Sequence, residues 1–317
     1  MELPIQTLPD DFEGCPAPGL YRCTDAVYRK IRAISASRLK LCRTSYAAFY
    51  RNRPIEDTES MRHGRAIDCY ALKGPEEFQR KYVVAPSIKL TSAEAKAEYA
   101  QWANDLLGDS VLNPSMSAPV LRESLVEAIQ ARGGDVVEAD WLPTIEAMRE
   151  AIRANENAEY HLTGPGEPHV VQIAKDRKTG LPLKGQCDRI QPRKDGGVWI
   201  PDLKSTADIG WGTPYSDTVR YYDVERVARN LQWKIQGAFY EMLWGLIAEG
   251  LGLPTRAASS FVVVDRKEYP QCIWSTPSDD AMADAHNQVR TWLDGIAECM
   301  RTGVWPEATT ELVVLEV

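Results

Sequence analysis

Apolar and polar residues follow two patterns along the chain, one before about residue 155 and another after it. The first part is typical of helices separated by polar loops, which we place at residues 35–50, 60–72, 91–107 and 140–155. Short apolar runs bounded by turns follow and predict strands at 169–175, 183–191 and 197–204. Beyond them the pattern predicts a long amphipathic helix at 225–249, strands at 259–265 and 271–275, and a helix at 278–301.

This order of elements predicts a mixed central β-sheet flanked by helices, in the α/β (α+β) class, with a helical N-terminal part. We expect residues 1–24, which are rich in proline, glycine and acids, to form an irregular arm. Residues 25–317 are expected to form a single domain, mainly helical at 25–155 and with the catalytic sheet and helices at 156–317. The stretch 109–135 is the least regular part of the helical region.

Two acids and a lysine lie on two consecutive predicted strands. Asp202 and Lys204 are two residues apart, so their side chains project from the same face of a strand. Asp202 follows the apolar run 198–201, and a carboxylate at the end of a buried strand is costly without a cation or hydrogen-bond partner. Asp188 lies on the preceding strand, so the two carboxylates can share a hard divalent cation such as Mg²⁺. A neighbouring ammonium can then orient or activate a water against a phosphodiester.

This pattern is typical of a metal-dependent nuclease, but Asp-x-Lys also occurs by chance at strand ends with a surface ion pair. A second pair of residues favours the nuclease interpretation. Gln236 and Tyr240 lie four residues apart in the predicted helix at 225–249, so they share one helical face. The alternative for this pair is a polar rim residue and a half-buried aromatic ring.

The composition of the chain excludes some classes of protein but does not identify its function. A hydrophobic content of 44% and a charged content of 26% are ordinary for a soluble globular enzyme. No apolar run approaches the ~20 residues needed to cross a bilayer, and the N-terminus lacks a secretion signal, so we expect a cytoplasmic protein and no membrane partner. The seven cysteines form no C-x-x-C pair, and Gly164-Pro165-Gly166 is not followed by G-K-[ST], so we expect neither a zinc site nor a nucleotide cofactor.

Charge is unevenly distributed along a chain whose net charge is −8. Residues 29–65 contain ten Lys or Arg against three acids, a local charge of 10 − 3 = +7, with aromatic residues interleaved. Such a segment is often a solvated helical face. Beside a nuclease core we interpret it as part of a groove that follows phosphates. The residues expected to contact DNA are Arg38, Lys40, Arg43, Arg62 and Arg65, with Ser205 and Thr206 after the Asp-x-Lys strand.

Asp188, Asp202-x-Lys204 and Gln236-x-x-x-Tyr240 together resemble the PD-(D/E)XK nuclease superfamily. Most of the chain looks like the RecE-type (exodeoxyribonuclease VIII-like) exonucleases of phages and prophages. Short segments carry this resemblance in the family's order, at residues 34–37, 64–72, 78–86, 261–267 and 303–306. Relative to that family, 109–135 looks like an insertion.

The chain departs from the family pattern at two positions. Asp68 stands where the family helix G-x-A-x-H carries a histidine, and His63 is too far along the helix to replace it. The family also tends to place a glutamate on the strand before the first aspartate. Here that strand has no acid inside it, and Glu167, His169 or Gln172 could stand near the position. Weaker or altered metal binding is therefore one expectation.

The resemblance implies a role for each candidate site residue. Mg²⁺, with Mn²⁺ as a substitute, would be held by Asp188, Asp202 and the Leu203 carbonyl. Lys204 would position the water and stabilise charge on the phosphate, and Gln236 and Tyr240 would hold the substrate strand or Lys204. Asp68 would complete the metal shell or contact the DNA end.

The resemblance also implies an activity and partners. These are 5′-to-3′ exonuclease action on double-stranded DNA ends, a homo-oligomer, and a 3′ overhang passed to a single-strand annealing protein in phage-type recombination inside a bacterial cell. The alternatives are an endonuclease, a single-strand-specific nuclease of the same superfamily, or a DNA-binding module with a weakened catalytic site.

Overall fold

The computed structural model describes residues 2–52, 58–109, 112–207, 209, 228 and 232–308. Seven of its strands form one mixed sheet in the order β1-β2-β5-β6-β7-β8-β9. The pairs β1–β2 and β7–β8 are parallel and the others antiparallel. The strands are β1 Ile5–Thr7, β2 Gly19–Arg22, β5 Glu167–Lys175, β6 Pro182–Pro192, β7 Val198–Thr206, β8 Ala257–Asp265 and β9 Cys272–Ser275.

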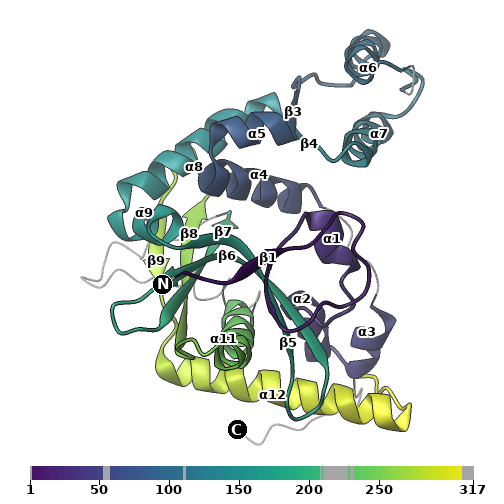
Figure 1. Cartoon of the computed structure of the whole chain (residues 1–317). Coiled ribbons are helices and arrows are strands. Elements are labelled where there is room, and N and C mark those ends of the chain that lie inside the picture. Colours follow the sequence, from purple (N-terminus) through teal and green to yellow (C-terminus); the bar gives the residue numbers. More distant parts are fainter. Residues whose placement is uncertain are drawn as a thin grey trace, which may run out of the picture.

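Helices cover both faces of this sheet (Figure 1). On one side lie α4 Glu59–Lys73, α5 Pro75–Lys81, α8 Leu142–Ala154 and α9 Glu156–Thr163. On the other side lie α11 Trp233–Gly250 and α12 Asp279–Thr302. The shorter elements are α1 Asp25–Lys30, α2 Ala36–Leu39, η1 Lys40–Arg43, α3 Tyr46–Arg51 and η2 Ala139–Trp141. The predicted α/β class, with a mixed sheet flanked by helices, is confirmed.

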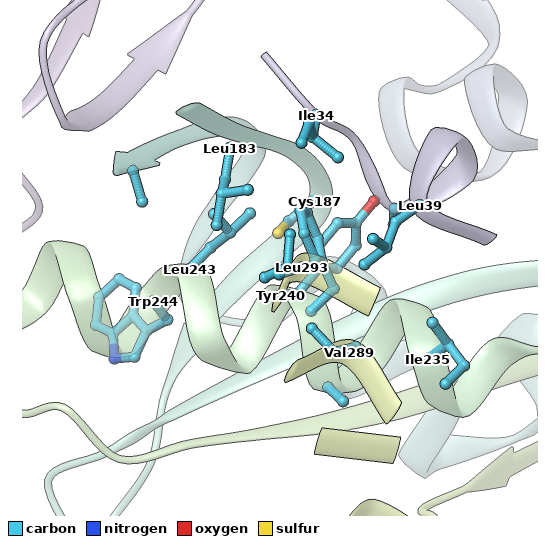
Figure 2. Close-up of a cluster of buried hydrophobic side chains, with 14 of the residues drawn as sticks. Ile34, Leu39, Leu183, Cys187, Ile235, Tyr240, Leu243, Trp244, Val289 and Leu293 are labelled. Carbon is cyan, nitrogen blue, oxygen red and sulfur yellow. The ribbon is translucent and has the colours of Figure 1, made fainter. Parts of the chain in front are cut away.

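Each face of the sheet has its own hydrophobic core. On the α11 side, Leu243 and Trp244 are fully buried against β6 and α12 (Figure 2). On the α4 side, Ile67 and Met148 pack with Leu203 of β7 and apolar residues of β8. Fully burying a side chain of this size stabilises the fold by about 1.5–3 kcal/mol. The central strands are therefore held from both faces, which makes the sheet a firm support for polar side chains at its strand ends.

A smaller unit projects from the main body between α5 and α8 (Figure 1). The strands β3 Tyr82–Ala85 and β4 Asp135–Glu138 pair in parallel, and between them run the helices α6 Ala93–Leu107 and α7 Ala118–Ala131. These two helices have a hydrophobic cluster of their own, centred on Ala103, Leu121 and Leu125.

Three expectations about secondary structure need correction. The segment 1–24 contains β1 and β2, and β2 pairs with β5, so it is not wholly irregular. The single helix expected at 35–50 is divided into α2, η1 and α3, with Ser35 and Ser45 capping α2 and α3. The stretch 109–135 contains the fourteen-residue helix α7. In the helix expected at 225–249, α11 begins at Trp233, and residues 225–227 and 229–231 lie outside the described residues.

None of the helices in the described part of the chain combines the length and the apolar character needed to cross a membrane.

Candidate active site

The strands β6 and β7 are joined by backbone pairing at one end and by a side-chain hydrogen bond further along. Their backbone ladder pairs Gln191 with Trp199 and Pro192 with Val198. Further along β7, the Leu203 N–H donates a 2.7 Å hydrogen bond to the Asp188 carboxylate rather than to a β6 carbonyl. The Asp188 carboxylate thus takes the place of a backbone acceptor. Because an extended residue points its N–H and C=O to the same side, the Leu203 carbonyl also faces this gap between the strands.

Asp202 and Lys204 lie on the α11 side of β7 and form an ion pair. Asp202 is only 5% exposed. Gln236 of α11 contacts both residues, because its Nε2 donates to Asp202 Oδ1 at 2.7 Å and its Oε1 accepts from Lys204 Nζ at 3.3 Å. Burial by itself would lower the pKa of Lys204, but the Asp202 and Asp188 carboxylates outweigh it and raise that pKa. Lys204 is therefore held as a charged ammonium.

Tyr240 fixes Gln236 from one helical turn away. The Tyr240 hydroxyl donates to the Gln186 carbonyl of β6 at 2.9 Å and accepts from Gln236 Nε2 at 3.2 Å. Its ring lies in the hydrophobic core beside Leu243 (Figure 2), and burial raises the pKa of the hydroxyl well above its usual range. The strand must come close to the helix here, since a Cβ added at Gly185 would lie 2.8 Å from ring and methyl atoms of Tyr240 and Leu243.

Asp68 approaches the same centre from α4, which packs on the other face of β7. Burial and the Asp188 charge raise the pKa of Asp68 well above its usual range, against the opposing charge of Lys204. Burial and the Asp202 charge likewise raise the pKa of Asp188 to about 7. The carboxyl groups of Asp68, Asp188 and Asp202 therefore form a crowded cluster with the ammonium of Lys204, in which each charge shifts the pKa of its neighbours.

The chemistry of this cluster suits Mg²⁺. Within the described residues no group of three or more His, Cys, Asp or Glu side chains is assembled for a metal. Mg²⁺ does not require such a cage, since it usually binds through one or two carboxylates and keeps several waters. Asp188, Asp202 and the Leu203 carbonyl offer hard oxygen donors, and a divalent cation would relieve the repulsion that raises the pKa of Asp188.

A cleft of about 1730 Å³ opens on the side of α1–α3, and the described residues that line it do not include those of this cluster. Its lining includes Arg65 and Gln186, both close in sequence to catalytic candidates. Basic side chains outnumber acidic ones along its walls by eight to four. The basic ones are Arg29, Lys30, Arg32, Arg38, Arg65, Lys73, Lys81 and Lys184, and the acids are Asp10, Asp25, Glu77 and Asp135.

The residues expected to contact DNA fall into three groups. Arg38 and Arg65 line the cleft. Lys40 instead lies in the catalytic cluster, where its Nζ is 3.5 Å from Gln236 Oε1, and burial and the neighbouring charge of Lys204 lower its pKa to about 8. The rest lie outside the cleft lining. Arg43 is exposed, Arg62 faces Glu123 at 3.8 Å, Ser205 is half-buried and Thr206 is buried.

The residues considered for the missing glutamate have different surroundings. Glu167 is paired with Arg22 at 2.5 Å, and the Gln172 amide donates to Cys187 Sγ at 2.8 Å. His169 lines the cleft and adopts a left-handed backbone conformation with φ of 50°, which no local sequence pattern indicates. Burial and the Lys73 charge lower the pKa of His169 to about 4, so it is neutral at physiological pH.

Sequence reasoning did not identify the cleft lysines Lys73, Lys81 and Lys184, which lie outside the segment 29–65. Lys73 and Lys81 occupy the last turns of α4 and α5, a common place for basic residues that complement the helix dipole. The sequence therefore offered no signal that separated them from ordinary helix ends.

The mixed sheet, its helical layers and the acids beside Lys204 have the arrangement of a PD-(D/E)XK-type fold. The chain belongs to the PDDEXK-like domain family DUF3799, a family of unknown function whose sequence model matches residues 35–314. This places it in the PD-(D/E)XK nuclease superfamily. No protein of curated function matches the chain.

The solved structures that are similar to it include the following two. One, from Eubacterium rectale, is described as a candidate exonuclease; it is 12% identical over 90% of each chain, with a TM-score of 0.49. The other, SSO0001, is 13% identical over 74% of this chain and 85% of that one, with a TM-score of 0.24.

Proposed function

We propose that the protein is a Mg²⁺-dependent deoxyribonuclease. The observation that carries this proposal is the position of Lys204, whose ammonium is held by Asp202 and by the Gln236 amide beside the Asp188 carboxylate. A half-buried, charged lysine among carboxylates is suited to act on a phosphodiester, which is itself an anion. A structural ion pair would not need the Gln236 amide to hold both of its members.

The proposed reaction is hydrolysis of a phosphodiester. Asp188, Asp202 and the Leu203 carbonyl would hold Mg²⁺, which would supply Lewis-acid stabilisation of the phosphate and a more acidic water. Lys204 orients the attacking water and stabilises the negative charge that develops on the phosphate oxygens. The water oxygen bonds to phosphorus and releases a proton to solvent, the bond to the leaving sugar oxygen breaks, and the leaving oxygen takes up a proton. Gln236 and Tyr240 hold Lys204 in place.

We further propose the activity that the RecE-type resemblance implies. The enzyme would degrade duplex DNA from its ends in the 5′-to-3′ direction and leave 3′ overhangs for an annealing protein, acting as a homo-oligomer in the bacterial cytoplasm. Mn²⁺ would substitute for Mg²⁺. These finer properties rest on the resemblance alone.

The test uses end-labelled linear duplex, single-stranded DNA and a closed circular plasmid, each with Mg²⁺, with Mn²⁺ and with EDTA. The variants are Lys204→Ala and Lys194→Ala, which makes the same change at an exposed residue of the turn between β6 and β7. We expect metal-dependent loss of linear duplex that Lys204→Ala abolishes and Lys194→Ala retains. The label released first gives the polarity.

Each other outcome points to one alternative. Cutting of the closed circle identifies an endonuclease, and degradation of single strands alone identifies a single-strand-specific nuclease. DNA binding without metal-dependent cleavage of any substrate contradicts the proposed function and favours a binding module, with Asp68 as the first residue to examine.

A further inference from the structure

One end of the basic cleft is lined by stacked aromatic rings rather than by charge. The rings of Tyr50 and Trp305 lie 4.7 Å apart at 23°, and the ring of Phe49 lies 6.0 Å from that of Trp305 at 19°. All three residues line the cleft, and the rings of Tyr50 and Phe49 each stack on that of Trp305. Tyr50 is 62% exposed, so this group of rings has an open outer surface. We call these three residues the aromatic shelf.

The shelf is held in position by the segment that follows α12. The Ala47 N–H of α3 donates to the Pro306 carbonyl at 3.0 Å. Arg51, at the end of the same helix, pairs with Glu307 at 2.6 Å. These contacts, made by the two residues that follow Trp305, help to hold its ring against Tyr50, so an incoming planar group would meet rings that are already ordered.

Arg38 adds a cation next to the shelf. Its guanidinium lies 4.5 Å from the Phe49 ring centroid and lines the cleft. Within the described part of the chain no acceptor reaches the buried Nε of Arg38. That atom is sealed from solvent, but the Arg38 side chain lines the cleft, where a phosphate can pair with its charge. An aromatic platform beside a cation that can take a phosphate is the combination that proteins use for unpaired nucleotides.

The shelf is also near the catalytic cluster. Arg38 belongs to α2 and contacts Phe49, while Lys40, two residues later, reaches Gln236 at 3.5 Å. One short segment of chain therefore contacts the shelf on one side and the catalytic residues on the other. A nucleic-acid strand that occupied the catalytic cluster could place a neighbouring base on the shelf.

We propose that the aromatic shelf is a binding subsite for an unpaired nucleotide, in which the base stacks on Tyr50 and Trp305 and a phosphate contacts Arg38. This inference rests on the proposed function, because it takes the basic cleft to be the nucleic-acid channel. The bases of a duplex are stacked on each other and offer no free face to a ring. The subsite thus selects a melted end or a single-stranded extension.

Binding is measured in EDTA, so that no strand is cut, by fluorescence anisotropy with two labelled probes, a short oligothymidylate and a blunt duplex. We expect Tyr50→Ala to bind the oligothymidylate about tenfold more weakly than the wild type, since stacking on one aromatic ring contributes on that order. Tyr50→Phe keeps the ring and should bind as the wild type does. Tyr269→Ala is the matched control, because Tyr269 is 77% exposed and does not line the cleft. Affinity for the blunt duplex should change little in any variant.

An abasic version of the oligonucleotide tests stacking without changing the protein. The wild type should bind it more weakly than oligothymidylate, and Tyr50→Ala should not distinguish the two. The proposal is overturned if Tyr50→Ala binds oligothymidylate like the wild type, if it loses both probes equally, or if the wild type binds no single strand.

The same preparations are assayed with Mg²⁺ for cleavage of linear duplex. If the wild type does not cleave linear duplex but the binding differences are as expected, the nuclease proposal is contradicted and the subsite proposal is not. If the wild type cleaves linear duplex but Tyr50→Ala binds oligothymidylate as the wild type does, the nuclease is supported and the subsite is contradicted.

Discussion

Gln236 on α11 and Asp202 on β7 are joined by a 2.7 Å hydrogen bond from the amide Nε2 to the carboxylate Oδ1. The same Nε2 lies 3.2 Å from the Tyr240 hydroxyl, so the two amide hydrogens have two acceptors and the amide oxygen is turned toward Lys204. One side chain therefore orients the acid and the lysine of the D-x-K strand together. The helix acts as a positioning element for the strand, which explains why two residues four positions apart on α11 matter to β7.

Replacing Gln236 with glutamate tests this role directly. Gln236→Glu removes the donor to Asp202 and places a second carboxylate against it. We expect Mg²⁺-dependent cleavage of linear duplex to fall about 100-fold, since a small displacement of a catalytic group can cost that much. Initial rates are compared with those of Gln79→Glu, the same change at an exposed residue of α5. Equal rates for the two variants would show that Gln236 has no positioning role.

A second prediction concerns the close approach of β6 to α11. Gly185→Ala would place a methyl group 2.8 Å from atoms of Tyr240 and Leu243, both packed in the core. We expect the free energy of unfolding to fall by about 1–3 kcal/mol, as in other overpacked cores. Cleavage should also fall, because Tyr240 must shift away from Gln236.

The control lies on the same helix. A Cβ at Gly250, the last residue of α11, meets no atom within 4 Å. Gly250→Ala should unfold in urea at the same denaturant concentration as the wild type or a higher one. If Gly185→Ala is as stable as Gly250→Ala, the close approach of β6 to α11 at Gly185 is not needed for stability.

The part of the site that is predictable from sequence is the part set by local geometry. Asp202 and Lys204 share a face because strands alternate, and Gln236 and Tyr240 share a face because helices repeat. The site also depends on distant segments of the chain, since the charge of Asp188 on β6 acts on Asp68 of α4, and the fold depends on pairings such as Leu20 of β2 with Gln172 of β5. The periodicity of residues within one segment does not predict such long-range pairings. Helix α7 in 109–135 was missed because the Asn-Pro and Gly-Gly dipeptides made the whole stretch look irregular. Both dipeptides lie outside the helix, one before it and one after it.

A third prediction concerns Mg²⁺ and folding. A ligand that binds only the folded state stabilises it by about 2.7 kcal/mol at one hundred times its Kd. We therefore expect Mg²⁺ to raise the melting temperature of the wild type by several degrees over the value in EDTA. Asp202→Asn should abolish this rise, while Asp284→Asn, at an exposed position of α12, should keep it. A rise of equal size in both variants would place the metal elsewhere.

The last prediction concerns the pH dependence of stability without metal. The folded pKa of Asp188 is about 7, whereas an aspartate in the unfolded chain titrates near ~3.9. Between these two values the folded protein holds a proton that the unfolded chain has released, so stability falls as pH rises from about 4 to about 7 and then levels off. The contribution of Asp188 is a few kcal/mol at most. Asp188→Asn keeps an acceptor for the Leu203 N–H but cannot titrate. Its free energy of unfolding should therefore lack the fall with rising pH that Asp188 causes.

Urea unfolding in EDTA at several pH values between 5 and 8 measures this difference between wild type and Asp188→Asn. Comparing the two proteins cancels titrating groups that do not depend on the Asp188 charge, such as His63 and His169, whose lowered pKa values act in the opposite direction. Asp68 does not cancel, because the Asp188 charge helps to raise its pKa, so its slope also becomes smaller in Asp188→Asn and adds to the difference. The same proton also competes with the cation, so the stabilisation by Mg²⁺ in the wild type should be larger at pH 8 than at pH 6. Parallel stability curves for the two proteins, together with a Mg²⁺ effect independent of pH, would show that Asp188 is already ionised in the folded protein at pH 5.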